Sequence, residues 1–436
     1  MTMKTIYFLA ALLISSLSLC AQAASFKTEK WNTSNGARVV FYQANEVPML
    51  DISIAFAAGS AYDNNFFGLA ALTNRLLDQG NSNLDANQIA EKIANTGAQF
   101  DSEVSRDMAI VRLKTLTSLP ALNEALDTFN LIVNKPNFRQ DAFNREKNQQ
   151  IIAITQAQES PADIANNLFF SKLYKNHPYG HPVNGTVESV KKISNWQVRD
   201  FYKKNYVANN AVIVMVGAIS SQQAHEIADN LVKNIPAGVK NPAISKSAPL
   251  AGAEQVNFDF SSSQTVLKLG QIGIQHDNPD YFPLMVGNYI LGGGSLVSRL
   301  STEIREKNGL TYGISSQFMP MPGNGPFMIS FSTQNNQAKQ ALKMTQDTLN
   351  DFLKSGPTDD ELNAAKQYLT GSFPLSLSSN SNIAGMLLRM TFYNLPDNYL
   401  DTYVAHIEAV TAEDIKKAFD MTIHPERMLL VSVGKM

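Results

Sequence analysis

The sequence is almost without cysteine and has few histidines. Of its 436 residues one is cysteine, Cys20, and six are histidine. A disulfide framework is therefore excluded, and so are zinc sites built from several thiolates. An excess of either charge is also missing, because 36 lysines and arginines stand against 38 aspartates and glutamates and leave a net charge of −2. Since no basic run exists either, nucleic acid is not expected as a partner.

Long hydrophobic runs are missing as well, with one exception at the N-terminus. There Lys4 precedes an apolar run over 6–19, and Ala-Gln-Ala follows at 21–23. A basic start, an apolar run and a small-residue cleavage signal predict a signal peptide over 1–23. The run is too short to span a bilayer, so we expect an exported protein with no transmembrane segment in the mature chain. A buried N-terminal helix and a lipoprotein anchored at Cys20 are the alternative interpretations.

The chain contains an internal repeat. Residues 198–217 align without gaps on residues 415–434, at an offset of 217, and each copy has the pattern of a helix followed by a strand that ends at glycine. Two unrelated helix–strand pairs are the alternative. About 410 mature residues are too many for one hydrophobic core. We therefore predict two homologous domains over 24–236 and 256–436, joined by the polar linker 237–255.

The fold class expected is α+β. Strands are expected over 99–113 and 327–332, and helical periodicity covers 86–96 and 140–173, where Ser160-Pro161 restarts the helix. Each domain is then an antiparallel-dominated sheet with helices packed on one face. The linker would let the two domains act as a clamp.

A helix is predicted over 68–80, since Leu69, Leu72 and Leu76 recur at helical spacing. It follows the sequence Gly-Ser-Ala-Tyr-Asp at 59–63. This arrangement resembles the first helix of the pitrilysin-type (inverzincin, insulinase-like) zinc metallopeptidases. In that family the helix carries H-x-x-E-H, two zinc-binding histidines one turn apart and a glutamate that acts as general base.

The resemblance implies a degenerate zinc site. The two histidine positions fall on Ala71 and Arg75, the general base on Asn74, and the third ligand, 77 residues past the second histidine, on Ile152. Zinc needs three protein ligands and an open position for water. We therefore expect no metal bound by this chain. Restoring histidine, glutamate and histidine at 71, 74 and 75 should not by itself make a protease, because Ile152 still lacks the third ligand.

Two acids lie near Ile152 along the chain. Glu146 precedes it by six residues, which turn a helix by about 240°, so Glu146 is expected to face elsewhere. Glu159 follows by seven residues and could share its face, but it lies about 10 Å further along the axis. An upstream insertion that brings Glu159 into register stays open.

A second candidate metal site is the pair His177 and His181. Two prolines and a glycine make the segment 176–182 a loop rather than a helix, and no acid stands at ligand spacing. Its His-Pro-Tyr-Gly sequence resembles a structural loop of the same family. The remaining histidines are isolated and are interpreted as surface or capping residues: His225, His276, His406 and His424.

The second half carries the other part of the resemblance. Ser-Arg-Leu at 298–300, Arg305-Glu306 and Gly-Leu-Thr-Tyr at 309–312 match the family's second-domain pattern S-R-L…R-E-x-x-G-L-x-Y. In the family this arginine and this tyrosine reach across to the substrate, which assigns Arg305 and Tyr312 to substrate binding. A salt-bridged surface arginine and a core tyrosine are the alternative.

Taken together, these features favour a non-catalytic, substrate-binding subunit of an exported zinc peptidase pair that acts on peptides. Some bacterial members of the family work in such pairs, and the resemblance implies a homologous catalytic partner with H-x-x-E-H and zinc. It also implies a periplasmic location. Two other hypotheses stay open, a peptide-binding or scaffold protein without proteolysis, and a zinc metallopeptidase with unconventional ligands.

Overall fold

The structure is a computed structural model that describes residues 26–81 and 83–436. The predicted signal peptide over 1–23 lies outside the described residues. Within the described part, no helix is both long enough and apolar enough to cross a bilayer.

The first half of the chain builds a six-stranded sheet in the order β1-β2-β8-β3-β7-β6. Its pairs are antiparallel except for β2 and β8. The strands are β1 (Glu29–Asn32), β2 (Arg38–Gln43), β3 (Met49–Phe56), β6 (Gln99–Val104), β7 (Ala109–Leu116) and β8 (Ala211–Gly217), and a small ribbon is formed by β4 (Gly80–Asn81) and β5 (Leu84–Asp85). The helices are α2 (Leu69–Arg75), α3 (Ala86–Asn95), α4 (Ala121–Asn134), α5 (Gln140–Ala157), α6 (Pro161–Tyr174), α7 (Val187–Lys192), α8 (Asn195–Asn205) and α9 (Ser221–Val232).

The second half builds a five-stranded sheet in the order β11-β12-β10-β13-β9, in which β13 and β9 form the parallel pair. Its strands are β9 (Glu254–Phe258), β10 (Gln264–Ile272), β11 (Ile314–Phe318), β12 (Pro326–Gln334) and β13 (Leu429–Val433). Its helices are α10 (Tyr281–Asn288), α11 (Ala338–Ser355), α12 (Asp359–Ser372), α13 (Asn380–Phe392), α14 (Tyr399–Ala409) and α15 (Ala412–Thr422).

The two sheets repeat one topology. Read from the parallel pair, β9-β13-β10-β12-β11 has the order of β2-β8-β3-β7-β6. The helices α8 and α15 have 11 residues each, and both of their ends differ by the offset of 217 found in the sequence. The predicted repeat and the α+β class are therefore confirmed. Between α9 and β9 the chain forms neither helix nor strand, and β9 begins at Glu254, within the last two residues of the predicted linker 237–255.

Local sequence explains where several of these helices begin. Ser160 accepts a hydrogen bond from the backbone N–H of Asp163, and Pro161 occupies the first helical position, so α6 restarts directly after α5 ends. Thr358 and Glu361 form the reciprocal bonds of a capping box at the start of α12. The start at Ser160-Pro161 was predicted from the sequence.

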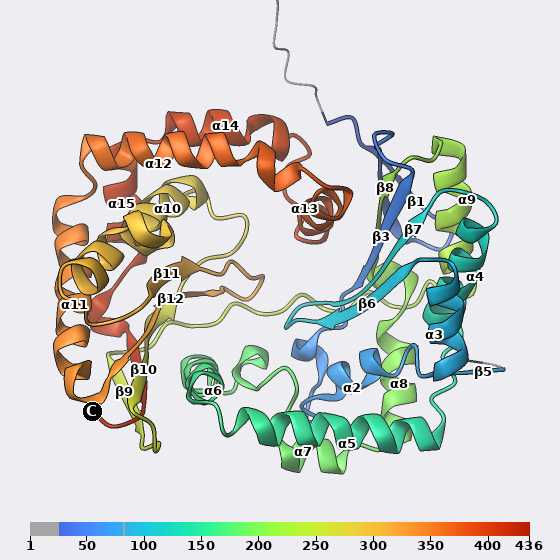
Figure 1. Cartoon of the computed structure of the whole chain (residues 1–436), viewed down its shortest axis with the longest axis horizontal. Coiled ribbons are helices and arrows are strands. Elements are labelled where there is room, and N and C mark those ends of the chain that lie inside the picture. Colours follow the sequence, from blue (N-terminus) through green and yellow to red (C-terminus); the bar gives the residue numbers. More distant parts are fainter. Residues whose placement is uncertain (1–25, 82) are drawn as a thin grey trace, which may run out of the picture.

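Each sheet is covered on both faces, and the covering helices come from both halves (Figure 1). The helices of the first half, α2, α4, α8 and α9 among them, enclose the larger core on one face of its own sheet. On the other face α13 of the second half packs against β3 and β8, where Leu387 and Leu388 are buried with Val40 and Val214. Burial of each leucine stabilises the fold by about 1.5–3 kcal/mol.

The second sheet receives the reciprocal contact. Its own helices form a core on one face. On the other face α6 of the first half packs against β10 and β13, so that Phe169 and Phe170 are buried with Val431. Figure 1 shows α6 and α13 between the two sheets. The two halves therefore exchange one helix each, a feature that the predicted clamp did not include.

Candidate functional site

The helix α2 begins at a buried carboxylate. Asp63 accepts hydrogen bonds from the backbone N–H groups of Gly68 and Ala70, both at 2.7 Å. It therefore satisfies two donors of the first turn, which have no partner within the helix. Gly68 has φ +94°, a left-handed conformation that favours glycine. Burial raises the pKa of Asp63 well above its ordinary value, and the two backbone donors oppose that shift.

Alanine, asparagine and arginine stand on α2 where the resemblance places the zinc chemistry. Ala71 is 4% exposed and offers no donor atom. Asn74 is 2% exposed, and its amide lies within hydrogen-bond distance of the carbonyl oxygen of Ile110 and the hydroxyl of Tyr206, at 3.5 and 3.4 Å. Arg75 is partly exposed. Within residues 26–81 and 83–436, no three of the side chains His, Cys, Asp and Glu are grouped as metal ligands would be.

The acid that reaches α2 from the long helix α5 is Glu146. Its Oε2 lies 3.7 Å from Nε of Arg75. Four residues further on, Gln150 donates to the carbonyl oxygen of Gly68 at 3.0 Å, so Glu146 and Gln150 form one face of α5 against α2. Ile152 is 50% exposed. The expectation that Glu146 faces away from the site is therefore wrong, because Glu146 faces Arg75 on α2. Counting 77 residues from position 75 gave Ile152, which lies six residues beyond Glu146 on α5.

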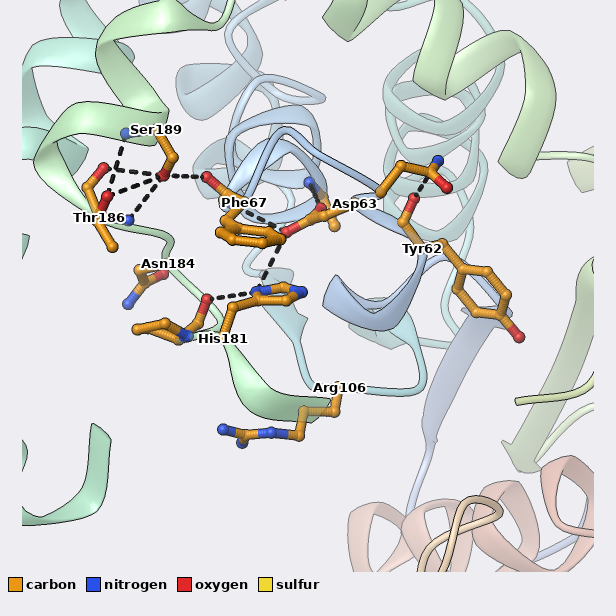
Figure 2. A network of polar contacts seen from close by, with 12 residues as sticks. Tyr62, Asp63, Phe67, Arg106, His181, Asn184, Thr186 and Ser189 are labelled. Carbon is orange, nitrogen blue, oxygen red and sulfur yellow. Dashed lines mark hydrogen bonds and ion pairs between the residues drawn. The ribbon is translucent and has the colours of Figure 1, made fainter. Parts of the chain in front are cut away.

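The two histidines of the His-Pro-Tyr-Gly loop bind backbone atoms instead of sharing a ligand position. Nε2 of His177 lies 2.7 Å from the carbonyl oxygen of Ser245, and Nδ1 of His177 accepts from the backbone N–H of Tyr179. His181 stacks on Phe67 with ring centroids 4.2 Å apart. Figure 2 shows its ring beside Asp63, with Nδ1 4.0 Å from the carboxylate. Burial lowers the pKa of His181, so the ring is neutral at neutral pH.

The same loop takes part in a buried polar network that links the two halves, which we call the interdomain network. The hydroxyls of Tyr179 and Tyr393 donate to the two carboxylate oxygens of Asp107, at 2.5 and 3.0 Å. The Tyr179 hydroxyl also accepts from the backbone N–H of Gly323. His276 stacks on Tyr393 with ring centroids 3.8 Å apart. Sequence analysis missed this network, because its members are 72 to 286 residues apart.

Arg305 and Tyr312 lie at the end of a π-helical segment, η6 (Ser301–Glu306), and in the loop before β11. Tyr312 is 89% exposed. Among the described residues, neither side chain has a hydrogen-bond or ion-pair partner. The alternative of a salt-bridged arginine and a core tyrosine is therefore not what the structure shows.

Arg299 of the same sequence pattern provides a contrast. It forms a bidentate pair with Glu361, with both N···O distances at 2.6 Å, and donates to the carbonyl oxygen of Gly356. Its guanidinium lies over the ring of Phe352, 5.0 Å from the centroid. Arg299 therefore ties η6 to α12, whereas Arg305 keeps all its donors free of partners in the described structure.

Comparison with known proteins agrees with this architecture. Residues 38–187 match the family model "Insulinase (Peptidase family M16)", and residues 192–369 match "Peptidase M16 inactive domain". A solved structure described as the peptidase M16 inactive domain from Pseudomonas fluorescens is 38% identical, covers 94% of this chain and 98% of its own, and superposes with a TM-score of 0.91.

Two curated relatives extend the comparison. "Non-peptidase homolog YmxG" of Helicobacter pylori is 27% identical, over 87% of this chain and 88% of its own length. "Uncharacterized zinc protease YmxG" of Bacillus subtilis is 26% identical, over 81% of this chain and 85% of its own length. The chain belongs to the M16 peptidase family, the pitrilysin-type or insulinase-like metallopeptidases. Within that family it is an inactive homologue.

Proposed function

We propose that this chain is the non-catalytic, substrate-binding subunit of a zinc peptidase pair that acts on peptides in the periplasm. A homologous partner with an intact H-x-x-E-H would hold the zinc and its activated water, and this chain would bind no metal. The observation that carries the proposal is the pair Arg305 and Tyr312, since neither side chain has a partner among residues 26–81 and 83–436 and Tyr312 is 89% exposed. Because water is their only neighbour at these donors, another molecule can bind there by displacing solvent alone.

The chemistry of the pair suits a peptide carbonyl. Arginine offers a planar fork of N–H donors and tyrosine one O–H donor. In the assembled pair, Arg305 and Tyr312 would hold the carbonyl of the scissile bond while the partner's zinc-bound water attacks it. Negative charge then develops on that oxygen, and fixed donors lower the free energy of the transition state.

The strand β6 gives an extended peptide a place to bind. It is the edge strand of the first sheet, and it packs beside α2. Its outward backbone groups are not used by another strand of the described sheet, so a peptide can add to it as one more strand. Asp101 and Glu103 on β6 both pair with Arg112 of β7. These acids are therefore partly neutralised along the edge where the peptide would lie.

The test is peptidase activity of the pair purified from the native organism. Arg305→Ala and Tyr312→Phe should each lower turnover about 10²–10³-fold, the usual effect of losing one such donor, while the complex stays intact. Matched controls are Arg427→Ala and Tyr368→Phe, which alter an exposed arginine and an exposed tyrosine of the same half. These controls should retain full turnover.

Several outcomes separate this proposal from the other hypotheses. Full turnover of both Arg305 and Tyr312 variants in an intact complex would refute their assigned role. Isolation of the chain without a homologous partner would favour a scaffold, and metal-dependent cleavage by the chain alone would favour unconventional ligands. Mass spectrometry of the mature N-terminus tests the export step, since cleavage is expected after Ala23.

A further inference from the structure

A cavity of about 740 Å³ lies where the two halves meet, outside the site described above. It is enclosed by the C-terminal end of α5, by α6, by the loop 182–186 and by Phe258 at the end of β9. Most of the exposed lining surface is apolar, and it includes side chains of Ala153, Ile154, Ala157, Ile164, Leu168, Val183 and Phe258. This volume is in the range of small-molecule and peptide-end sites, about 300–1,000 Å³. We call it the junction cavity.

Arg106 is the only cation among the residues that line the junction cavity. Its Nε donates to the carbonyl oxygen of Tyr179 at 3.2 Å, and its guanidinium carbon lies over the ring of Phe170, 3.6 Å from the centroid. No described residue accepts a hydrogen bond from either terminal nitrogen. Figure 2 shows the guanidinium extending away from Asp63 and His181. The arginine is thus held in one orientation, with two parallel donors unused.

The neighbouring carboxylate does not use those donors. Asp107 accepts from the hydroxyls of Tyr179 and Tyr393. Burial lowers the pKa of Arg106 to about 10, which still leaves it fully charged at neutral pH. A cation fixed against an aromatic ring at an apolar wall is the arrangement that binds a planar anion in bidentate fashion.

We propose that the junction cavity binds the carboxylate of an otherwise apolar ligand, with Arg106 as its anchor. A lining with one cation suits a singly charged group, whereas a phosphate would call for further cations. Two sources offer this chemistry, the C-terminus of a peptide that ends in an apolar residue and a fatty acid. Asn166 and Asn167 on α6 also line the cavity, and neither amide is hydrogen-bonded within the described structure. Free amides favour the peptide, since they can bind its backbone.

One acid opposes the anion. Asp163 lies in the first turn of α6, exposed at the rim of the junction cavity, where water and salt screen its charge. Asp163→Asn should therefore bind the ligand at least as tightly as the wild type. This inference does not depend on the proposed peptidase pair, because the cavity belongs to the isolated chain.

The experiment is calorimetric titration of the full chain with three probes. These are an N-acetylated pentapeptide ending in leucine as the free acid, the same peptide with a C-terminal amide, and dodecanoate. The free-acid peptide or dodecanoate, or both, should bind in a 1:1 ratio. The free-acid peptide should bind at least tenfold more tightly than the peptide amide. Arg106→Gln should remove the binding. If only dodecanoate binds and needs Arg106, the ligand is a fatty acid; if no acid binds, or the amide binds equally well, the proposal is wrong.

A second variant guards against misfolding of the Arg106 variant. Ala157→Trp fills the junction cavity and leaves the arginine untouched, and Gln156→Trp puts the same side chain on an exposed position of α5 outside the lining. Ala157→Trp should weaken binding of the acid more than tenfold, while Gln156→Trp should bind like the wild type. Equal binding by both tryptophan variants would overturn the proposal.

Discussion

Removing one hydroxyl from the interdomain network should weaken the whole molecule. In Tyr393→Phe the ring can keep its stack on His276, but Asp107 loses the donor at 3.0 Å from its Oδ2. Asp107 is 4% exposed, so water cannot replace that donor. Burial raises the pKa of Asp107, and the two tyrosine hydroxyls are the main groups that oppose this by stabilising the charged form.

The expected loss follows from the type of bond. A hydrogen bond to a charged group contributes about 1.5–3 kcal/mol. If the whole described chain melts in one transition, its entropy of unfolding is about 0.9 kcal/mol/K, so Tm should fall by about 2–4 °C. Differential scanning calorimetry measures both the shift and the number of transitions. If the network couples the halves, the variant should show a lower Tm and an earlier loss of the contact between α13 and the first sheet in hydrogen exchange.

A matched control exists in the second half. Among the described residues, the hydroxyl of Tyr403 has one hydrogen-bond partner, the sulfur of Met285 at 3.8 Å, so Tyr403→Phe removes a hydroxyl without leaving a buried carboxylate short of a donor. Its Tm should stay close to that of the wild type. A Tyr393→Phe protein that melts within about 1 °C of the wild type, or a control that shifts equally, would refute the reasoning.

Three further predictions concern metal and pH. The purified chain should contain no stoichiometric zinc after dialysis, and about one zinc per chain in elemental analysis would contradict this. The triple variant Ala71→His, Asn74→Glu and Arg75→His should bind zinc, because Glu146 lies beside position 75 and can act as the third ligand. Adding Glu146→Gln to this variant should remove the metal. A triple variant without zinc would show that Glu146 cannot act as a ligand. Burial lowers the pKa of His276 to about 4 in the folded chain, so the unfolded chain takes up a proton at this histidine first as the pH falls below about 6.5. The free energy of unfolding should therefore decrease between about pH 6.5 and pH 4, by at most about 3 kcal/mol. Denaturant titrations of His276→Gln and wild type over that pH range should show this dependence in the wild type only.

The zinc prediction replaces an expectation from the sequence. Counting along the chain put the third ligand position on Ile152, and on that basis the restored triple variant would lack a third ligand. In the structure, Glu146 of α5 is the side chain that reaches Arg75. A fixed count fails when the connection between two helices differs by a few residues, since only the packing of α5 on α2 fixes which turn faces the site.

The parts of the fold that sequence could predict are those encoded locally. The helix–strand repeat at an offset of 217 was predictable because apolar spacing in α8 and α15 is preserved residue by residue. The restart of the helix at Ser160 was predictable from capping chemistry alone. Helix α2 was predicted to continue to residue 80 but ends at Arg75. Its last turn opens because Gly80, at φ +147°, already begins β4.

The parts that could not be predicted depend on contacts between distant segments. Nothing near Asp107 in the sequence indicates that Tyr393 will donate to it across 286 positions. The exchange of α6 and α13 is hidden for the same reason, since an apolar helix face does not show which of two sheets it will cover. The resemblance to the family identified Arg305 and Tyr312. The structure adds that no described residue accepts a hydrogen bond from either side chain.

The exchange of α6 and α13 bears on how the chain reaches its folded state. A ribosome releases the polypeptide from the N-terminus, so strands β2, β3 and β8 are complete well before α13 at Asn380–Phe392 has been made. During that interval no helix covers Val40, Ala55 and Val214. This apolar face of the newly synthesised sheet is then exposed and can associate with other chains. Holding the chain unfolded until synthesis is complete would avoid that hazard.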